Sequence, residues 1–452
     1  MKIIIVGGGK VGVTLVEQLS REGHNITLID MDGDKLQRIA NTFDVMGVTG
    51  NGASYSTQME AGVETADLLI AVTGSDELNL LCCLFAKKAG NCQTIARVRN
   101  PVYNKEVRYI QEELGLSMVI NPEFAASMEI ARILKFPSAI RIDTFAKGKV
   151  ELLKFKIYPE YHLDQMRITD IRGKFRCDIL ICAVERGEDV MIPSGNFILR
   201  EGDIVSIVAP PRQSADFFHR IGIANNRIKN ALIVGGGKIS YYLSKQLEAM
   251  GISVKIIEMD RGRCEELSEL LPKATIIYGD GTDQSILLEE GIRQADAFVA
   301  LTNLDEENIL LALYAKSQSK AKLITKVNRI SFDQIIDQLD IDSIIYPKYI
   351  TASYIIQYVR AMQNSIGSNV ETLYRIIENR AEALEFCVHE NSPVVGIPLE
   401  KLDLKENLLI CCINRDQRVI IPKGQDTIEV GDTVIVVTTN TGLNDLKDIL
   451  KH

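Results

Sequence analysis

Three glycines near the start of the chain have the spacing of a turn that binds a pyrophosphate. Gly7, Gly9 and Gly12 follow a short apolar run, residues 3–6, and open a stretch with helical spacing. In this fingerprint the first glycine permits a tight turn, the second lets the backbone approach the pyrophosphate, and the third allows close helix–strand packing. Asp30 ends the next strand-like run, near the usual spacing of about 20 residues. Its carboxylate would accept hydrogen bonds from ribose hydroxyls and repel a 2′-phosphate.

The helix that follows the turn adds its own attraction for phosphate, because its first amides are free and its dipole is positive at that end. We therefore interpret the turn as a nucleotide site. The alternative from the residues alone is a degenerate turn that is kept for packing. No catalytic residue and no metal ligand is assigned.

Two further segments are expected at the same edge of the sheet. Thr73 and Gly74 follow a strand that should neighbour the first one in the order 3-2-1-4-5-6, which places them at the crevice outside the strand ends. Ser75 also fits a helix N-cap, so the segment has a purely structural interpretation. Arg97 closes the fifth strand and would meet a phosphate or a carboxylate; a solvated edge charge is the alternative.

The chain repeats itself at an offset that stays constant within one residue. Gly7 corresponds to Gly235 and Asp30 to Glu258. Far beyond any nucleotide motif, "ILICAVERGEDVMIPSG" from Ile179 corresponds to "LLICCINRDQRVIIPKG" from Leu408. A register held over most of the chain indicates duplication of a whole module.

The second module keeps part of the fingerprint. Gly235, Gly237 and the acid Glu258 remain, whereas Ser240 takes the place of the packing glycine and should widen the approach of helix and strand. Lys326 stands where the first module has an arginine. The residues predict either an altered second nucleotide site or a structural module with an empty cleft.

Each module has two parts that differ in their pattern of strand-like and helical runs, and this pattern predicts the fold class α/β. Strand-like runs alternate with helical stretches in the first part, as in a doubly wound, Rossmann-like parallel sheet. The second part is a small α+β domain rich in antiparallel strands. The expected domains are residues 1–137, 138–225, 226–367 and 368–452.

Composition limits the classes of partner. A formal net charge of −9 in 452 residues argues against nucleic acid, which needs clustered lysine and arginine. No apolar run approaches the roughly 18 residues of a spanning helix. The chain begins with a strand-like run and shows no cleavable signal, so a cytoplasmic location is expected. The nine cysteines lack zinc-ligand spacing and suit buried positions better.

Catalytic machinery is missing from the sequence. An NAD-dependent oxidoreductase, the main alternative, needs a proton-transfer group beside the nicotinamide, and the five histidines form no motif. A redox regulator based on Cys82 and Cys83 is a further alternative, but adjacent cysteines in a helical run favour core positions. The pattern therefore favours a sensor.

Two amphipathic stretches stand in equivalent places after the last strand of each sheet. They read "EFAASMEIARILKF" from Glu123 and "YITASYIIQYVRAM" from Tyr349. Each carries more apolar surface than one sheet face requires, so we expect it to cross to a partner domain. Packing on its own sheet is the alternative.

The whole chain closely resembles the TrkA family, the nucleotide-binding regulatory subunits of Trk-type potassium uptake systems, which consist of tandem RCK (KTN) domains. The motifs that carry the resemblance are "IIIVGGGKVG", "VTGNGAS", "AVTGSDELN", "ARVRNP" and "VIIPKGQDTIEVGDTVIVV". The resemblance places the nucleotide contacts at Gly7, Gly8, Gly9, Lys10, Val11, Asp30, Thr73, Gly74 and Arg97. In the second module it places them at Gly235, Gly236, Gly237, Lys238, Ile239, Glu258 and Lys326, where the departures at Ser240 and Lys326 leave the ligand open.

The resemblance also implies cofactors and partners. NAD(H) and ATP or ADP would bind the first part of each module and bias the shape of a ring of such domains. The ring would be a homotetramer, a dimer of dimers, on the inner face of the cell membrane. There it would regulate a membrane-embedded potassium-translocating subunit of the TrkH/TrkG type.

Overall fold

The computed structural model describes residues 1–90, 92–135, 140–145, 149–222, 228–328, 339, 341–364, 370–377, 380–416, 418–440, 443 and 445–451. It separates into two compact units, and each unit combines equivalent parts of the two modules. Unit 1 is Met1–Ala131 with Ile228–Ile356, and unit 2 is Arg132–Arg227 with Gln357–His452. The domain limits expected after residues 137, 225 and 367 all lie outside the described residues.

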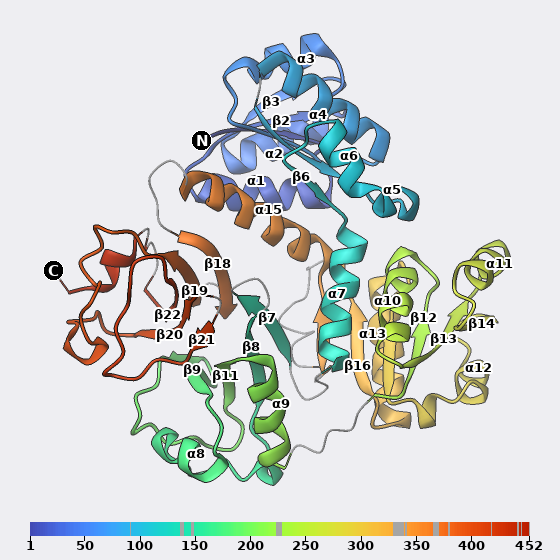
Figure 1. Cartoon of the computed structure of the whole chain (residues 1–452). Coiled ribbons are helices and arrows are strands. Elements are labelled where there is room, and N and C mark those ends of the chain that lie inside the picture. Colours follow the sequence, from blue (N-terminus) through green and yellow to red (C-terminus); the bar gives the residue numbers. More distant parts are fainter. Residues whose placement is uncertain are drawn as a thin grey trace. The chain divides into compact units, whose positions relative to one another are not determined.

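The first lobe of unit 1 is a six-stranded parallel sheet (Figure 1). Its strand order is β3-β2-β1-β4-β5-β6, as the fingerprint predicted. The strands are β1 (Lys2–Val6), β2 (Asn25–Asp30), β3 (Met46–Thr49), β4 (Leu68–Ala71), β5 (Gln93–Arg97) and β6 (Met118–Ile120). The helices are α1 (Lys10–Arg21), α2 (Gly33–Phe43), α3 (Tyr55–Glu60), the 3-10 turn η1 (Val63–Thr65), α4 (Asp76–Gly90), α5 (Pro101–Lys105), α6 (Val107–Glu113) and α7 (Pro122–Lys135).

The apolar runs form strands because both faces of the sheet are covered, which favours continuous rather than alternating hydrophobic residues. All four residues of β4 are buried. On α1, Leu15, Val16 and Leu19 are fully buried and form the inner face of the helix. This packing holds the N-terminus of α1 at the carboxyl edge of the sheet, next to the ends of β1 and β4.

The second lobe of unit 1 repeats this plan with the strand order β14-β13-β12-β15-β16-β17. Its strands are β12 (Asn230–Val234), β13 (Ser253–Glu258), β14 (Thr275–Tyr278), β15 (Ala297–Ala300), β16 (Lys322–Lys326) and β17 (Ser343–Ile345). The helices are α10 (Lys238–Ala249), α11 (Arg261–Leu270), α12 (Gln284–Glu289), the turn η4 (Ile292–Gln294), α13 (Asp305–Gln318) and α15 (Pro347–Asn364).

The two lobes of unit 1 meet through α7 and α10, which lie side by side in Figure 1. The ring of Phe124 on α7 packs edge-on against Tyr242 on α10, with 5.5 Å between the ring centres. The amide of Gln246 on α10 donates to the hydroxyl of Ser127 at 2.7 Å. The amphipathic helix α7 therefore contacts the other lobe, as its excess apolar surface predicted.

Unit 2 consists of two five-stranded antiparallel sheets. The first has the order β10-β9-β11-β8-β7, and the second has the order β18-β19-β22-β20-β21. Their strands are β7 (Arg141–Phe145), β8 (Val150–Lys156), β9 (Leu180–Arg186), β10 (Asp189–Met191), β11 (Ile204–Ala209), β18 (Val370–Ile377), β19 (Ala381–Cys387), β20 (Leu408–Arg415), β21 (Arg418–Ile420) and β22 (Thr433–Thr438). The helices and turns are η3 (Pro159–Tyr161), α8 (Ile168–Phe175), α9 (Pro211–Arg220), η5 (Leu399–Lys401) and η6 (Leu446–Ile449).

The two sheets of unit 2 share one hydrophobic core. It includes Phe145, Leu152 and Cys182 from the first module and Cys411 and Val437 from the second. Cysteine is confirmed here as a small buried residue, as the composition indicated. The expected fold class, two Rossmann-like domains each followed by a small α+β domain, is confirmed.

Candidate functional site

The turn between β1 and α1 needs glycine for steric reasons. Gly7 has φ of 104°, a backbone conformation that glycine adopts without strain. A Cβ on Gly12 would lie 1.9 Å from the carbonyl oxygen of Gly7, so a side chain there would force the helix away from the strand. A Cβ on Gly9 would meet no atom within 4 Å, so this glycine borders open space. The geometry matches the three roles of the fingerprint.

Asp30 holds the turn in place from the end of β2. Its Oδ2 accepts the amide of Gly8 at 2.6 Å and lies 3.1 Å from Nζ of Lys35. Its Oδ1 accepts the amide of Asp32 at 3.0 Å. Burial alone would raise the pKa of Asp30, but these donors outweigh it and lower the pKa. The carboxylate is therefore charged at neutral pH and oriented beside the turn.

A cavity of about 540 Å³ lies above this turn. Of the residues predicted for the first site, those that line it are Gly7, Gly9, Lys10, Val11, Asp30, Thr73, Gly74 and Arg97. Gly8 and Gly12 lie behind the lining and shape the turn. The cavity also carries the charged side chains of Lys35, Arg99, Glu123 and Lys348. Cationic side chains thus outnumber carboxylates in a chain whose net charge is −9.

Part of the cavity wall was not predicted from the sequence. Gly50, Asn51 and Gly52 line it, and a Cβ on Gly52 would lie 2.1 Å from Cγ1 of Val6. The signal for this segment was its recurrence as "GDGTDQ" in the second module. Other wall residues, Asn328, Pro347 and Lys348, come from the second lobe of unit 1. Nothing local in their sequence indicates that they belong to the first cleft.

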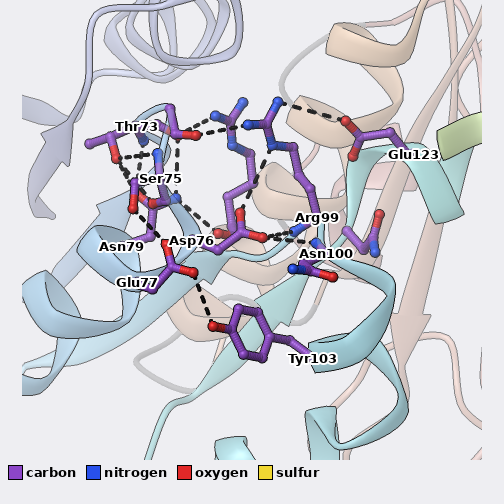
Figure 2. Close-up of polar contacts among 12 residues, drawn as sticks. Thr73, Ser75, Asp76, Glu77, Asn79, Arg99, Asn100, Tyr103 and Glu123 are labelled. Atoms are coloured by element: carbon purple, nitrogen blue, oxygen red, sulfur yellow. Dashed lines mark hydrogen bonds and ion pairs between the residues drawn. The ribbon is translucent and has the colours of Figure 1, made fainter. Parts of the chain in front are cut away.

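A polar network joins the ends of β4 and β5 (Figure 2). The side chain of Asn79 accepts the amide of Thr73 at 2.8 Å and donates to the carbonyl of Arg97 at 2.9 Å. The guanidinium of Arg97 donates to the carbonyl of Thr73, and that of Arg99 donates to the carbonyl of Gly74 at 2.8 Å. These hydrogen bonds hold the guanidinium groups of both arginines at the cavity wall.

Arg99 also faces two carboxylates in Figure 2. Its guanidinium lies 3.9 Å from Asp76 and 3.8 Å from Glu123, while Asp76 accepts the amides of Arg99 and Asn100 at 2.9 and 2.8 Å. Burial raises the pKa of Glu123, although the neighbouring cations Arg99, Lys238 and Arg97 oppose the shift. Burial lowers the pKa of Arg97. A ligand phosphate beside Arg97 would favour the charged guanidinium, whereas the same negative charge would oppose ionisation of Glu123.

Ser75 begins α4 as an N-cap, with its hydroxyl accepting the amide of Leu78 at 3.2 Å. The structural interpretation of this residue is therefore correct. The capping role of Ser75 does not conflict with the lining of the cavity, because Thr73 and Gly74, the two preceding residues, form the cavity wall.

The second glycine turn keeps the acid and changes the residues around it. Oε2 of Glu258 accepts the amide of Gly236 at 2.6 Å, as Asp30 does in the first module. The fully buried Ser240 donates to the carbonyl of Gly235. Since a Cβ at Gly12 would lie 1.9 Å from the matching oxygen, the second turn must be wider at this point.

Lys326 is turned inward in the second lobe. Its Nζ donates to the carbonyl of Leu301 at 3.2 Å, and the residue is 7% exposed. Burial lowers its pKa, with Asp305 and Glu123 opposing the shift. Gly235, Gly237, Lys238 and Ile239 form the turn and the start of α10, so the structure brings the predicted residues of the second module to one strand edge.

Both parts of each module match known domains. Residues 3–122 and 231–347 match the TrkA-N domain, and residues 152–222 and 383–451 match the TrkA-C domain. The chain is 32% identical over its full length to the Trk system potassium uptake protein TrkA homolog 2 of Methanosarcina mazei, all of which is covered. It is 33% identical to the Trk system potassium uptake protein TrkA of Haemophilus influenzae, with 96% of this chain and 95% of that protein covered.

This chain belongs to the TrkA family. The resemblance seen in its motifs is thereby confirmed along the whole sequence. Its full-length relatives with these tandem domains are named as Trk potassium uptake proteins, which supports the regulatory interpretation over that of an oxidoreductase.

Solved structures share the fold of this TrkA-family chain. The GsuK channel bound to NAD superposes with a TM-score of 0.64 at 18% identity, covering 97% of this chain and 76% of that one. GsuK bound to ADP superposes with a TM-score of 0.50 at 15% identity, covering 79% and 69%. Within the described part of the TrkA-family chain, no helix is both long and apolar enough to span a membrane.

Proposed function

We propose that this chain senses nucleotides for a Trk-type potassium uptake system and binds NAD(H), ATP or ADP in the cleft of the first lobe. The cavity above the Gly7–Gly12 turn is the observation that carries the proposal. It combines a glycine-lined helix N-terminus with the cations Lys10, Arg97, Arg99 and Lys348. Backbone amides at a helix start and a surplus of cationic side chains are what a phosphate chain requires.

The predicted contact residues suit an adenine nucleotide with a free ribose. Asp30 stands at the end of β2, where its carboxylate would accept the ribose hydroxyls and repel a 2′-phosphate. The related fold of GsuK, which holds NAD in one structure and ADP in another, supports this choice of ligands. The terminal phosphate of ATP would extend past the turn toward Arg97, Arg99 and Lys348.

The second cleft is proposed as an altered site of the same class. Gly235, Gly236, Gly237, Lys238, Ile239, Glu258 and Lys326 are its proposed contacts. Lys326 already donates to a carbonyl, and the turn is wider at Ser240. We expect the second cleft to differ from the first in its preferred nucleotide.

Nucleotide binding regulates transport only if the ligand binds one conformation better than another. We propose that the domains assemble in the cytoplasm as a homotetrameric ring of two dimers. This ring docks on a membrane-embedded potassium-translocating subunit of the TrkH/TrkG type, on the inner face of the membrane. The bound nucleotide then shifts the equilibrium between ring shapes, and the ring shape sets potassium conductance.

A flux measurement tests this function. The chain is reconstituted with its membrane-embedded subunit in lipid vesicles, and potassium uptake is followed with NADH, ADP or ATP present. We expect uptake to depend on the nucleotide, and Asp30→Ala to shift that dependence to higher nucleotide concentration. Glu113→Ala, a change at an exposed position of α6 in the same lobe, serves as the control. A rate of potassium uptake that is the same with and without each nucleotide would overturn the proposed function.

A further inference from the structure

Helix α10 runs from the second glycine turn to the wall of the first cavity. It begins at Lys238, directly after Gly237, so its free amides lie at the second glycine turn, where the proposed second nucleotide would bind. One turn further along the same helix, Tyr242 is buried and 5% exposed. A displacement at the N-terminus of a helix is carried along its hydrogen-bonded axis, because the helix moves as a rigid element.

Tyr242 makes three contacts with the first lobe. Its hydroxyl accepts the side-chain amide of Asn121 at 2.9 Å and donates to the backbone carbonyl of Arg99 at 3.4 Å. Its ring packs edge-on against Phe124 with 5.5 Å between the ring centres. Burial raises the pKa of Tyr242 to about 12, so the hydroxyl keeps the proton that it donates.

The groups that Tyr242 contacts belong to the wall of the first cleft. Arg99 lines the cavity and pairs with Glu123 at 3.8 Å. Asn121 caps α7, accepting the amide of Phe124 at 2.9 Å, and the next two residues, Pro122 and Glu123, line the cavity. The tyrosine therefore fixes the backbone from which both charged side chains project.

The first module lacks a tyrosine in the matching place. The residue of α1 that corresponds to Tyr242 is Thr14, and its hydroxyl donates to the carbonyl of Lys10 within the same helix at 2.9 Å. The duplicated helices thus differ at the position where α10 contacts the opposite lobe. Divergence at this one position gives the second helix a polar contact that α1 does not make through Thr14.

We propose that Tyr242 is a positioning residue that couples the two clefts, so that a nucleotide in the second cleft changes the affinity of the first. The inference rests on the proposed function, since it requires nucleotide in both clefts. Phosphate bound at the start of α10 shifts the helix, and Tyr242 transmits the shift to the backbone of Arg99 and Asn121. Arg99 and Glu123 then present a different wall to the ligand of the first cleft.

Calorimetric titration of the full chain with ADP tests the coupling. Glu258→Ala should abolish binding in the second cleft, so this variant gives the affinity of the first cleft alone. Asp30→Ala should abolish binding in the first cleft and gives the affinity of the second. We expect the wild-type isotherm to depart from two independent sites by about 5-fold or more in affinity. In Tyr242→Phe, which keeps the ring packing and removes the hydroxyl, the isotherm should equal the sum of two independent sites.

A matched control and a separate readout distinguish coupling from simple stabilisation. Tyr241→Phe removes the hydroxyl of the neighbouring buried tyrosine and should retain the coupling. A merely structural role of Tyr242 would change the affinity of each single cleft, measured in the silenced backgrounds, and leave the coupling factor unchanged.

The other outcomes separate the inference from the function on which it rests. The proposed coupling would be overturned if the two sites of the wild type were independent, or if the coupling survived in Tyr242→Phe. It would also be overturned if Asp30→Ala bound no ADP, because the second cleft would then have no ligand. In each of these cases nucleotide binding by the first cleft could still be correct. If neither the wild type nor any variant bound ADP, NADH or ATP, the coupling and the proposed function would both be overturned.

Discussion

At the scale of single residues, each glycine turn is held by an acid before any ligand is present. Asp30 and Glu258 accept the amide of the middle glycine at 2.6 Å in their respective lobes. The carboxylate that would bind ribose therefore also fixes the conformation of the phosphate turn. Because one side chain serves both purposes, its charge should affect folding as well as binding.

The charge of Asp30 makes stability depend on pH. Its pKa is lower in the folded chain than the usual 3.8. The charged form thus stabilises the fold above about pH 4, and this contribution is lost as the pH falls below that value. Asp30→Asn should lower the free energy of unfolding by about 1 kcal/mol at pH 7, after allowance for solvent screening.

Urea unfolding at pH 7 and near pH 3 measures this effect. The difference between wild type and Asp30→Asn should shrink at the lower pH, whereas Asp34→Asn, an exposed change on α2, should have little effect at either. A difference that stays constant with pH would show that the charge of Asp30 does not stabilise the turn.

The packing glycine gives a second prediction at this scale. Gly12→Ala should destabilise the chain by roughly 1–3 kcal/mol, because its Cβ would lie 1.9 Å from the carbonyl oxygen of Gly7. Ser240→Gly in the wider second turn should cost only about 1 kcal/mol, through the lost hydrogen bond to Gly235. Thermal unfolding of both variants compares them, and equal losses would contradict the difference inferred between the two turns.

At the scale of elements, the sequence predicted the local parts and the contact of α7 with the other lobe, but it missed which residues of the second module line the first cavity. The glycine turn depends on residues close in sequence, and the strand order belongs to the fold that this turn indicates, so spacing was sufficient for both. Asn328, Pro347 and Lys348 enter the first cavity from the other lobe. Their placement depends on how the two lobes pack together, and residue spacing along the chain does not predict that packing.

The contribution of α15 to the first cavity is testable through Lys348. Lys348→Met should weaken ATP binding several-fold, because it removes a cation at the far end of the phosphate chain, and should affect NADH less. Lys88→Met, on the exposed side of α4, is the matched control. Equal losses for the two nucleotides would remove Lys348 from the recognition of the terminal phosphate.

At the scale of the whole molecule, duplication supplies each unit with two equivalent halves. In unit 2 the repeated positions Cys182 and Cys411 meet in one hydrophobic core, and in unit 1 Glu123 of the first lobe is within electrostatic range of Lys238 and Lys326 of the second. The repeat in the sequence predicted two modules, but it did not predict that equivalent parts pair with each other. That pairing depends on complementary surfaces, which become visible only when the chain is folded.

The account depends most directly on nucleotide binding by the first cleft. Calorimetric titration of the purified chain with NADH, NADPH, ADP and ATP, repeated with Asp30→Ala, measures it as stoichiometry and affinity. We predict at least one site per chain that binds NADH more tightly than NADPH and is weakened by Asp30→Ala. Unchanged affinity in Asp30→Ala, or no binding of any of the four nucleotides, would contradict the account.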